Sequence, residues 1–272
     1  MEAKTQIIEY KKSFINVYFF GEGTKYLFCF HGYGEDGSSF EFLKNSLGQT
    51  YTLIAIDLPF HGNTMWNEGL LMTTEDLINI IDAIIKQHNK NNENKFSLLG
   101  FSLGGRIALH LLQTVPSRIE RAALIAPDGL HLNFWYALGT QTSLGNKLFA
   151  YTMKKPNWFF NLVNVGYRTK LLSKSIAKFT HHYLDDEKER LLLYKRWTTM
   201  RKFKPNAFAV KKAIEKYKIA LRVLFGSYDR IILSKRNSFF NNNPYVKNQV
   251  IEAGHMLLKE RYADDIALLF SQ

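Results

Sequence analysis

A short turn sequence places a serine where it could act as a nucleophile, the pentapeptide G-F-S-L-G at residues 100–104. The apolar run over residues 95–99 predicts a buried strand before it, and the spacing of apolar residues over 106–112 predicts a helix after it. Glycines on both sides of the serine let strand and helix approach closely, which would hold Ser102 in a strained conformation with its hydroxyl projecting. Ser102 is therefore a candidate nucleophile, provided that a base lies beside it.

Two later strand ends carry the residue types that activate a serine. Asp229 follows the strand predicted over residues 220–225, and His255 follows the strand predicted over 249–251. The His255 imidazole can accept the serine proton and return it to a leaving group, while a carboxylate holds the ring in the correct tautomer. Asp128, after the strand predicted over residues 122–126, is a competing candidate for that carboxylate.

The elements that must position these groups alternate between strands and helices, which predicts an α/β fold with a mostly parallel sheet covered by helices on both faces. The strand signal stops from Asp128 to Lys218, where we expect helices over 157–165, 171–179 and 186–197. We therefore expect a core of residues 1–127 and 219–272, interrupted by a helical insertion over 128–218. The other expected strands cover 14–20, 26–30 and 51–56, and the other expected helices cover 40–47, 73–88 and 266–270.

The order of the motifs adds a family resemblance. The turn H-G-Y-G at residues 31–34 ends one predicted strand, the loop D-L-P-F-H-G at 57–62 ends the next, and the serine turn, Asp229 and His255 follow in that order. With these motifs the chain resembles the α/β-hydrolase superfamily, in its capped esterase, lipase and acyl-hydrolase branch.

The resemblance implies an α/β-hydrolase fold in which residues 128–218 form a cap over the active site. It implies a catalytic triad of Ser102, Asp229 and His255, with the backbone N–H groups of Tyr33 and Leu103 as the oxyanion hole. The usual acid loop of the family resembles Gly226-x-x-Asp229, which favours Asp229 over Asp128. A serine at position 102 argues against the dehalogenase and epoxide-hydrolase branches, which use aspartate there.

Three further residues in these loops are expected to have structural roles. The resemblance implies that His31 braces neighbouring loops and that His61 is likewise structural, while Asp57 shapes its own loop. The same loop carries Phe60 where relatives usually have glycine, which leaves the exact shape of this loop open without affecting the expected fold.

The formal net charge of +12 is concentrated in one part of the sequence. Residues 128–218 contain 18 Lys or Arg and 6 Asp or Glu, whereas basic and acidic residues balance in the remainder. These charges form either a solvated face or a field that attracts an anionic substrate or surface. They match no nucleic-acid-binding motif, so we expect no specific nucleic-acid partner and at most a weak contact with anionic surfaces.

Composition limits the remaining classes. With 46% hydrophobic residues the chain can bury a full core, and its longest apolar runs are too short for a transmembrane segment. A single cysteine, Cys29, lies inside a predicted strand, and the N-terminal residues show no signal-peptide pattern, so we expect a cytoplasmic protein. There is no G-x-G-x-x-G motif, no P-loop and no Cys/His cluster with metal spacing, so we expect no cofactor and no metal.

The expected function is hydrolysis of an ester, thioester or related acyl bond in a small molecule that carries a negative charge or none. Trp135 and Trp158 in the insertion are candidate substrate contacts, although aromatic residues there could equally form its own core. Arg106, directly after the serine turn, resembles an arginine of the menaquinone-pathway branch, which leaves a lyase or carbon–carbon hydrolase acting on an anion as an alternative. A catalytically silent ligand-binding protein is the other alternative.

Overall fold

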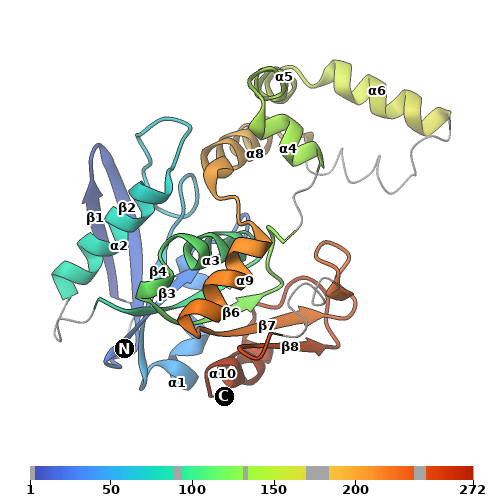
Figure 1. Ribbon diagram of the computed structural model, residues 1–272. Helices are drawn as coiled ribbons and strands as arrows, with labels where there is room; N and C mark the ends of the chain where they lie inside the picture. Colours follow the sequence, from blue (N-terminus) through green and yellow to red (C-terminus); the bar gives the residue numbers. More distant parts are fainter. Residues whose placement is uncertain (1–3, 89–93, 131–133, 170–183, 236–242, 272) are drawn as a thin grey trace. The chain divides into compact units, whose positions relative to one another are not determined.

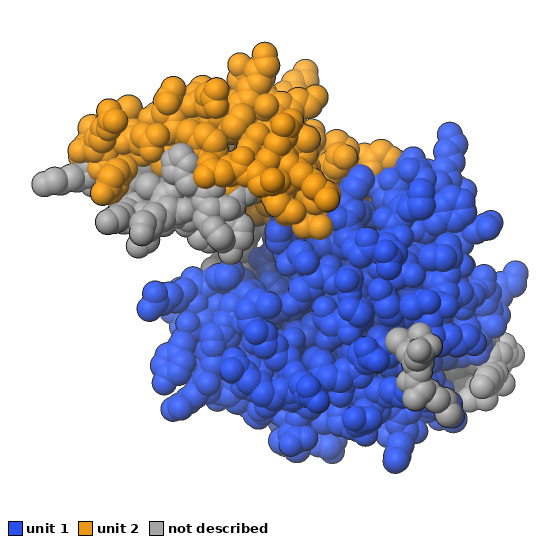
Figure 2. Space-filling view, turned by 180° about the vertical axis from the view of Figure 1, so that it is seen from behind, with its two compact units in different colours: residues 1–68, 73–131, 203–272 blue, residues 69–72, 132–202 orange. Residues whose placement is uncertain are grey.

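The structure is a computed structural model that describes residues 4–88, 94–130, 134–169, 184–235 and 243–271. It divides into two compact units, which are described separately below (Figure 2). Unit 1 contains residues 1–68, 73–131 and 203–272, and unit 2 contains residues 69–72 and 132–202.

Unit 1 is built on a sheet that has eight strands within the described residues, in the order β1-β2-β4-β3-β5-β6-β7-β8 (Figure 1). All neighbouring strands from β4 to β8 are parallel, whereas β2 pairs antiparallel with β1 and with β4. The expected mostly parallel sheet is therefore confirmed. The strands are β1 (Lys4–Tyr10), β2 (Ser13–Phe20), β3 (Lys25–Phe30), β4 (Tyr51–Ile56), β5 (Phe96–Phe101), β6 (Ile119–Ile125), β7 (Ala220–Gly226) and β8 (Val246–Ile251).

Strand β1 is the one described strand that the sequence did not predict. It lies at the edge of the sheet and pairs along its whole length with β2, from Lys4 opposite Phe19 to Tyr10 opposite Ser13. Only Ile8 of this strand is buried, so its sequence lacks the apolar alternation by which a half-buried strand is recognised. Pairing with β2, rather than burial of its own side chains, holds it in the sheet.

Helices cover both faces of this sheet (Figure 1). Helix α3 packs on β3, β5 and β6 and against α9, while α10 packs on β6 and β7 and against α1 on the opposite face. Between the layers Cys29 is fully buried, and this burial raises the pKa of its thiol. The helices are α1 (Lys44–Leu47), α2 (Thr74–His88), α3 (Leu103–Thr114), α9 (Ala207–Tyr217) and α10 (Ala263–Ser271), with 3-10 turns at Gly37–Leu43, Pro116–Arg118 and Glu260–Tyr262.

Unit 2 is helical. It contains α4 (Phe134–Gln141), α5 (Ser143–Lys154), α6 (Asn157–Arg168), α8 (Glu187–Thr199) and a 3-10 turn at Met200–Lys202. The helices expected over 157–165 and 186–197 are confirmed, and the one expected over 171–179 lies outside the described residues. The half-buried Trp197 ring of α8 packs on Tyr136 of α4 and Phe149 of α5, at centroid distances of 5.2 and 5.9 Å, so it contributes to packing within the unit. No helix in the described parts of the chain is long and apolar enough to cross a bilayer.

The basic charge is shared between the two units. Residues 203–218, which the expected insertion of 128–218 included, belong to unit 1, where α9 packs against α3. By sequence, residues 132–202 contain 13 Lys or Arg and 4 Asp or Glu, so unit 2 carries +9. The other basic residues of that segment lie on and around α9, including Lys211, Lys212 and Lys216.

At the start of helix α2, Thr73 and Asp76 each accept a hydrogen bond from the other's backbone N–H. The Asp76 N–H donates to Thr73 Oγ1 at 3.1 Å, and the Thr73 N–H donates to Asp76 Oδ2 at 2.8 Å. The other carboxylate oxygen of Asp76 accepts from the Tyr10 hydroxyl at 2.7 Å and from Lys11 Nζ at 2.6 Å. This carboxylate therefore ties the start of α2 to the end of the edge strand β1.

We expect Asp76→Asn to destabilise the protein in a pH-dependent way. Burial raises the pKa of Asp76, but the bonds from Lys11, Thr73 and Tyr10 outweigh it and lower this pKa to about 2. Because the folded pKa lies below the unfolded one, the carboxylate stabilises the protein by about 2 kcal/mol above pH 4 and loses this effect as the pH falls through about 2. Urea unfolding should show the gap between wild type and variant shrinking from pH 6 to pH 2. Asp82→Asn, at an exposed ion pair with Arg118, is the control, and an equal gap at every pH would contradict the assignment.

Candidate active site

Ser102 lies at the sharp turn between β5 and α3. Its φ of +50° and ψ of −109° place it in a region that residues other than glycine rarely adopt. Its N–H donates to the Ile125 carbonyl at 3.0 Å, and its own carbonyl accepts from the N–H groups of Asp128, at 2.9 Å, and Arg106, at 3.3 Å. Bonds to β6 and to the turn after it therefore hold the backbone of the predicted nucleophile on both sides.

Three glycines make this turn sterically feasible. A Cβ at Gly104 would overlap the Phe30 carbonyl at the end of β3, and a Cβ at Gly100 would lie 2.5 Å from the Gly104 carbonyl oxygen. A Cβ at Gly105 would lie 2.7 Å from the Cα of Pro127. The obstacles are backbone atoms, which cannot move aside as a flexible side chain can. Helix α3 can therefore start directly against the sheet only because these positions have no side chain.

We expect Gly104→Ala to destabilise unit 1 severely, because the added methyl group must displace the backbone of β3. The change should lower the melting temperature by many degrees or abolish soluble expression, at a cost of several kcal/mol. Gly254→Ala, in the same unit, is the matched control, since a Cβ there meets no atom within 4 Å. Circular dichroism melting of both variants measures the difference. Equal melting temperatures would show that the close approach at Gly104 is not required.

The side chains of Ser102, His255 and Asp229 form a continuous hydrogen-bonded chain. His255 Nε2 lies 3.0 Å from Ser102 Oγ, and His255 Nδ1 lies 2.7 Å from Asp229 Oδ2. The second carboxylate oxygen of Asp229 accepts the N–H groups of Ile231 and Ile232, each at 2.8 Å. The structure thus brings together the three residues predicted as the triad, from the ends of β5, β7 and β8.

The hydrogen bonds around Asp229 favour an ionised carboxylate beside the His255 imidazole. Burial acts to raise the pKa of Asp229, but the bonds from His255, Ile232 and Ile231 outweigh it, so the pKa of Asp229 falls below its usual value. The anionic carboxylate accepts the His255 Nδ1–H, which leaves the Nε2 lone pair facing the Ser102 hydroxyl. The competing acid, Asp128, pairs with the Arg106 guanidinium instead.

The turn at residues 31–34 lies against the end of β5. A Cβ at Gly32 would lie 2.8 Å from the Phe101 ring, just before Ser102. His31 braces this turn, since its Nδ1–H donates to the Gly32 carbonyl at 2.8 Å and its Nε2 accepts the Leu58 N–H at 3.1 Å. Tyr33, the first predicted oxyanion donor, therefore belongs to a turn in contact with the end of β5. Leu103, the second, is the first residue of α3, where a backbone N–H has no acceptor within the helix.

Glu35 is a residue of this site that the sequence analysis did not identify. Its carboxylate accepts the Gly32 N–H at 3.2 Å. Burial raises the pKa of Glu35, while the hydrogen bond from the Gly32 N–H acts to lower it. A glutamate in a loop gives no pattern from which such a contact could be foreseen, because the contact depends on how the turn folds back on itself.

The loop after β4 is held by a buried carboxylate. Asp57 accepts from Asn16 Nδ2 at 2.9 Å and from the N–H groups of Gly37, at 2.7 Å, and Asn63, at 2.8 Å. This confirms that Asp57 shapes its own loop. Phe60, where relatives usually have glycine, has a φ of +63°, so a phenylalanine occupies the left-handed conformation that a glycine would adopt without strain.

The predicted substrate contacts have different surroundings. Arg106 is 5% exposed and its guanidinium pairs with Asp128. Trp158 is exposed on α6 in unit 2, where its ring packs on Phe159 at 5.9 Å. Trp135 belongs to α4, but its side chain lies outside the described part of the structure. Among the described residues, no three His, Cys, Asp or Glu side chains form a group that could hold a metal ion.

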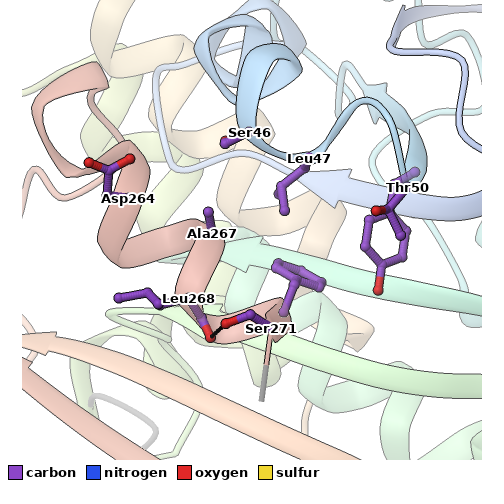
Figure 3. Close-up of a pocket in the computed structure, with 9 residues that line it drawn as sticks. Ser46, Leu47, Thr50, Asp264, Ala267, Leu268 and Ser271 are labelled. Atoms are coloured by element: carbon purple, nitrogen blue, oxygen red, sulfur yellow. Dashed lines mark hydrogen bonds between the residues drawn. The ribbon is translucent and has the colours of Figure 1, made fainter.

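A surface hollow of about 450 Å³ lies between α1 and α10, on the face of the sheet opposite α3 (Figure 3). No residue of the predicted triad lines this hollow, so it is not part of the candidate active site. Its lining comes from Ser46, Leu47, Thr50 and Tyr51 on one side and from Asp264, Ala267, Leu268, Phe270 and Ser271 on the other.

Comparison with known proteins identifies the family. A family model described as "alpha/beta hydrolase fold" matches residues 25–260. Pimeloyl-(acyl-carrier protein) methyl ester esterase of Salmonella heidelberg is 30% identical over 107 residues, which cover 39% of this chain and 38% of that protein. The dihydrolipoyllysine-residue acetyltransferase component of the acetoin cleaving system of Cupriavidus necator is 29% identical over 109 residues, which cover 40% of this chain and 28% of that protein. The chain thus spans about a third of the length of these relatives.

Solved structures agree in fold. The structure of a thermophilic esterase from Thermogutta terrifontis matches with a TM-score of 0.66 at 14% sequence identity, over 99% of this chain and 98% of that chain. At this level of identity the match supports the fold and leaves the substrate open.

Proposed function

The chain belongs to the alpha/beta hydrolase fold family, and we propose that it is a serine hydrolase that cleaves an ester, thioester or related acyl bond. The observation that carries the proposal is the position of His255 between Ser102 Oγ and Asp229, at 3.0 and 2.7 Å. These are the contacts that acyl transfer requires of a nucleophile, a base and an orienting acid.

In the proposed acylation step, Ser102 Oγ attacks the acyl carbon while its proton passes to His255 Nε2. The carbonyl oxygen becomes an oxyanion that accepts hydrogen bonds from the backbone N–H groups of Leu103 and Tyr33. Asp229 stabilises the imidazolium that forms. When the tetrahedral intermediate collapses, the proton moves from His255 to the leaving oxygen or sulfur atom, and the acyl group stays on Ser102.

The second step reverses the roles. Water attacks the acyl-serine carbonyl and gives its proton to His255 Nε2, and the same two N–H groups bind the oxyanion. Collapse breaks the acyl–Oγ bond, and the proton returns from His255 to Ser102 Oγ, which releases the carboxylic acid and restores the starting state.

The two alternatives have less support. A lyase or carbon–carbon hydrolase acting on an anion was suggested by Arg106, but that side chain is buried beside Asp128. A catalytically silent binding protein has no need for an intact hydrogen-bonded chain from serine to acid. Reaction with a fluorophosphonate probe distinguishes that class, because only an activated serine reacts.

Replacement of Ser102 by alanine should abolish hydrolysis and probe labelling without unfolding the protein. The reason is that Ser102 Oγ is the hydroxyl that lies beside His255 Nε2, at 3.0 Å. A panel of p-nitrophenyl esters and acyl thioesters measures turnover, and circular dichroism checks the fold. Ser227→Ala, in the loop that carries Asp229, is the control and should keep wild-type activity. Given measurable wild-type turnover, an active Ser102→Ala enzyme would refute the proposed nucleophile.

Replacement of Asp229 by asparagine should lower kcat by about 10⁴-fold, because a neutral amide neither stabilises the imidazolium nor fixes the tautomer. KM should change little, since the change removes an interaction made in the transition state. Asp128→Glu keeps a carboxylate at the competing position and should leave His255 with its partner. Equal losses of kcat in the two variants would contradict the assignment of Asp229 as the acid.

The net charge of unit 2 favours substrates that carry a negative charge. A positive field raises the association rate of anions, and salt screens it, since the Debye length falls from about 10 Å at 0.1 M to about 3 Å at 1 M. We expect a carboxylate-bearing ester to have a higher kcat/KM than its neutral analogue at 0.1 M salt and to lose most of this advantage at 1 M. Equal values at low salt would show that the basic residues form only a solvated face.

A further inference from the structure

The backbone of Ser102 depends on the loop that follows β6. This loop donates the Asp128 N–H to the Ser102 carbonyl, while the last residue of β6, Ile125, accepts the Ser102 N–H. Two residues of the loop have left-handed backbones, Ala126 with a φ of +41° and Gly129 with a φ of +97°. A loop that is strained at Ala126 requires further contacts to keep a single conformation.

Arg106 supplies such a contact from the first turn of α3. Its guanidinium pairs with Asp128 Oδ2, and the other carboxylate oxygen accepts the Gly129 N–H at 2.6 Å. The stem of Arg106 also packs under the loop, because a Cβ at Gly129 would lie 2.8 Å from Arg106 Cγ and 2.8 Å from Pro205 Cγ. With 5% of its surface exposed, the arginine is enclosed by these groups.

These contacts form a closed ring. It runs from Ser102 along the first turn of α3 to Arg106, across the ion pair to Asp128, and back through the Asp128 N–H to the Ser102 carbonyl. We propose that Arg106 and Asp128 are positioning residues, which fix Ser102 Oγ relative to His255 and the Leu103 N–H relative to the reacting carbonyl. This role rests on the proposed function and gives Arg106 a task other than binding substrate.

The ring acts on geometry and not on the charge of the substrate. A misplacement of about 1 Å at a reacting group costs on the order of a hundredfold in rate. Loss of the ion pair would let the loop shift the Ser102 carbonyl, and with it the hydroxyl and the N–H of the next residue. The effect should therefore appear in kcat and should be the same for neutral and anionic substrates.

The test uses the full chain with three variants, after Ser102 labelling by a fluorophosphonate has been established for the wild type. Arg106→Met removes the charge and keeps the stem, Asp128→Asn keeps the size of the side chain, and Arg106→Lys keeps the charge without the planar fork. Arg118→Met breaks the exposed ion pair with Asp82 and is the control. Melting temperature, kcat and KM are measured with a matched pair of neutral and carboxylate-bearing esters, well below each melting temperature.

We expect Arg106→Met and Asp128→Asn to lower kcat by about 10- to 100-fold for both esters, with KM changed by less than about threefold. Arg106→Lys should recover part of the loss, and Arg118→Met should match the wild type. If Arg106→Met does not fold, Asp128→Asn still tests the proposal. This variant removes the negative charge that pairs with Arg106, but the asparagine side-chain oxygen can still accept the Gly129 N–H.

Folded variants that keep wild-type kcat would overturn the proposal and leave the ion pair a purely stabilising role. A rise in KM confined to the carboxylate ester would also overturn it, because Arg106 would then bind substrate. A wild type that neither reacts with the probe nor turns over either ester would instead refute the proposed function itself.

Discussion

The close approach of α3 to the sheet is the constraint on which the candidate site depends. The helix starts immediately after Ser102, and a Cβ at Gly104 would overlap the backbone of β3. The chain can therefore reverse direction within one residue, but this requires a strained backbone with a positive φ at Ser102. This reversal leaves the hydroxyl at the carboxyl edge of the sheet and the Leu103 N–H at the start of a helix, where a backbone N–H has no acceptor within the helix.

The parallel arrangement of β5, β6, β7 and β8 brings the other groups to the same edge. Because parallel strands end on the same side, the loops that follow β7 and β8 place Asp229 and His255 next to the end of β5. The Asp229 side chain is fully buried, yet it accepts three hydrogen bonds and its pKa is lowered. Those donors keep the acid ionised in a place where burial alone would favour its neutral form.

The two charged residues beside the serine turn illustrate how packing changes an interpretation. From sequence, Arg106 was a candidate contact for an anionic substrate and Asp128 was a candidate acid. In the structure each is the partner of the other, and neither contacts His255 through any described hydrogen bond. The Asp128 carboxylate offsets the positive charge of the Arg106 guanidinium. The pair therefore contributes more to the shape of the turn than to the electrostatic field that attracts a substrate.

The sequence by itself determined the α/β class, the mostly parallel sheet, and the position of Ser102 between a strand and a helix. These features are local, since apolar spacing and paired glycines report on short stretches of chain. It did not reveal strand β1, whose exposed residues lack a pattern, or Glu35, whose partner lies across a turn. The acid-loop pattern Gly226-x-x-Asp229 already favoured Asp229 over Asp128, and the structure places Asp229 in a hydrogen bond with His255. Only the tertiary structure decided that Asp128 pairs with Arg106 and that α9 packs with unit 1. Contacts between residues far apart in the chain depend on how strands and loops pack in space, and the spacing of residues along the sequence does not specify which of them come into contact.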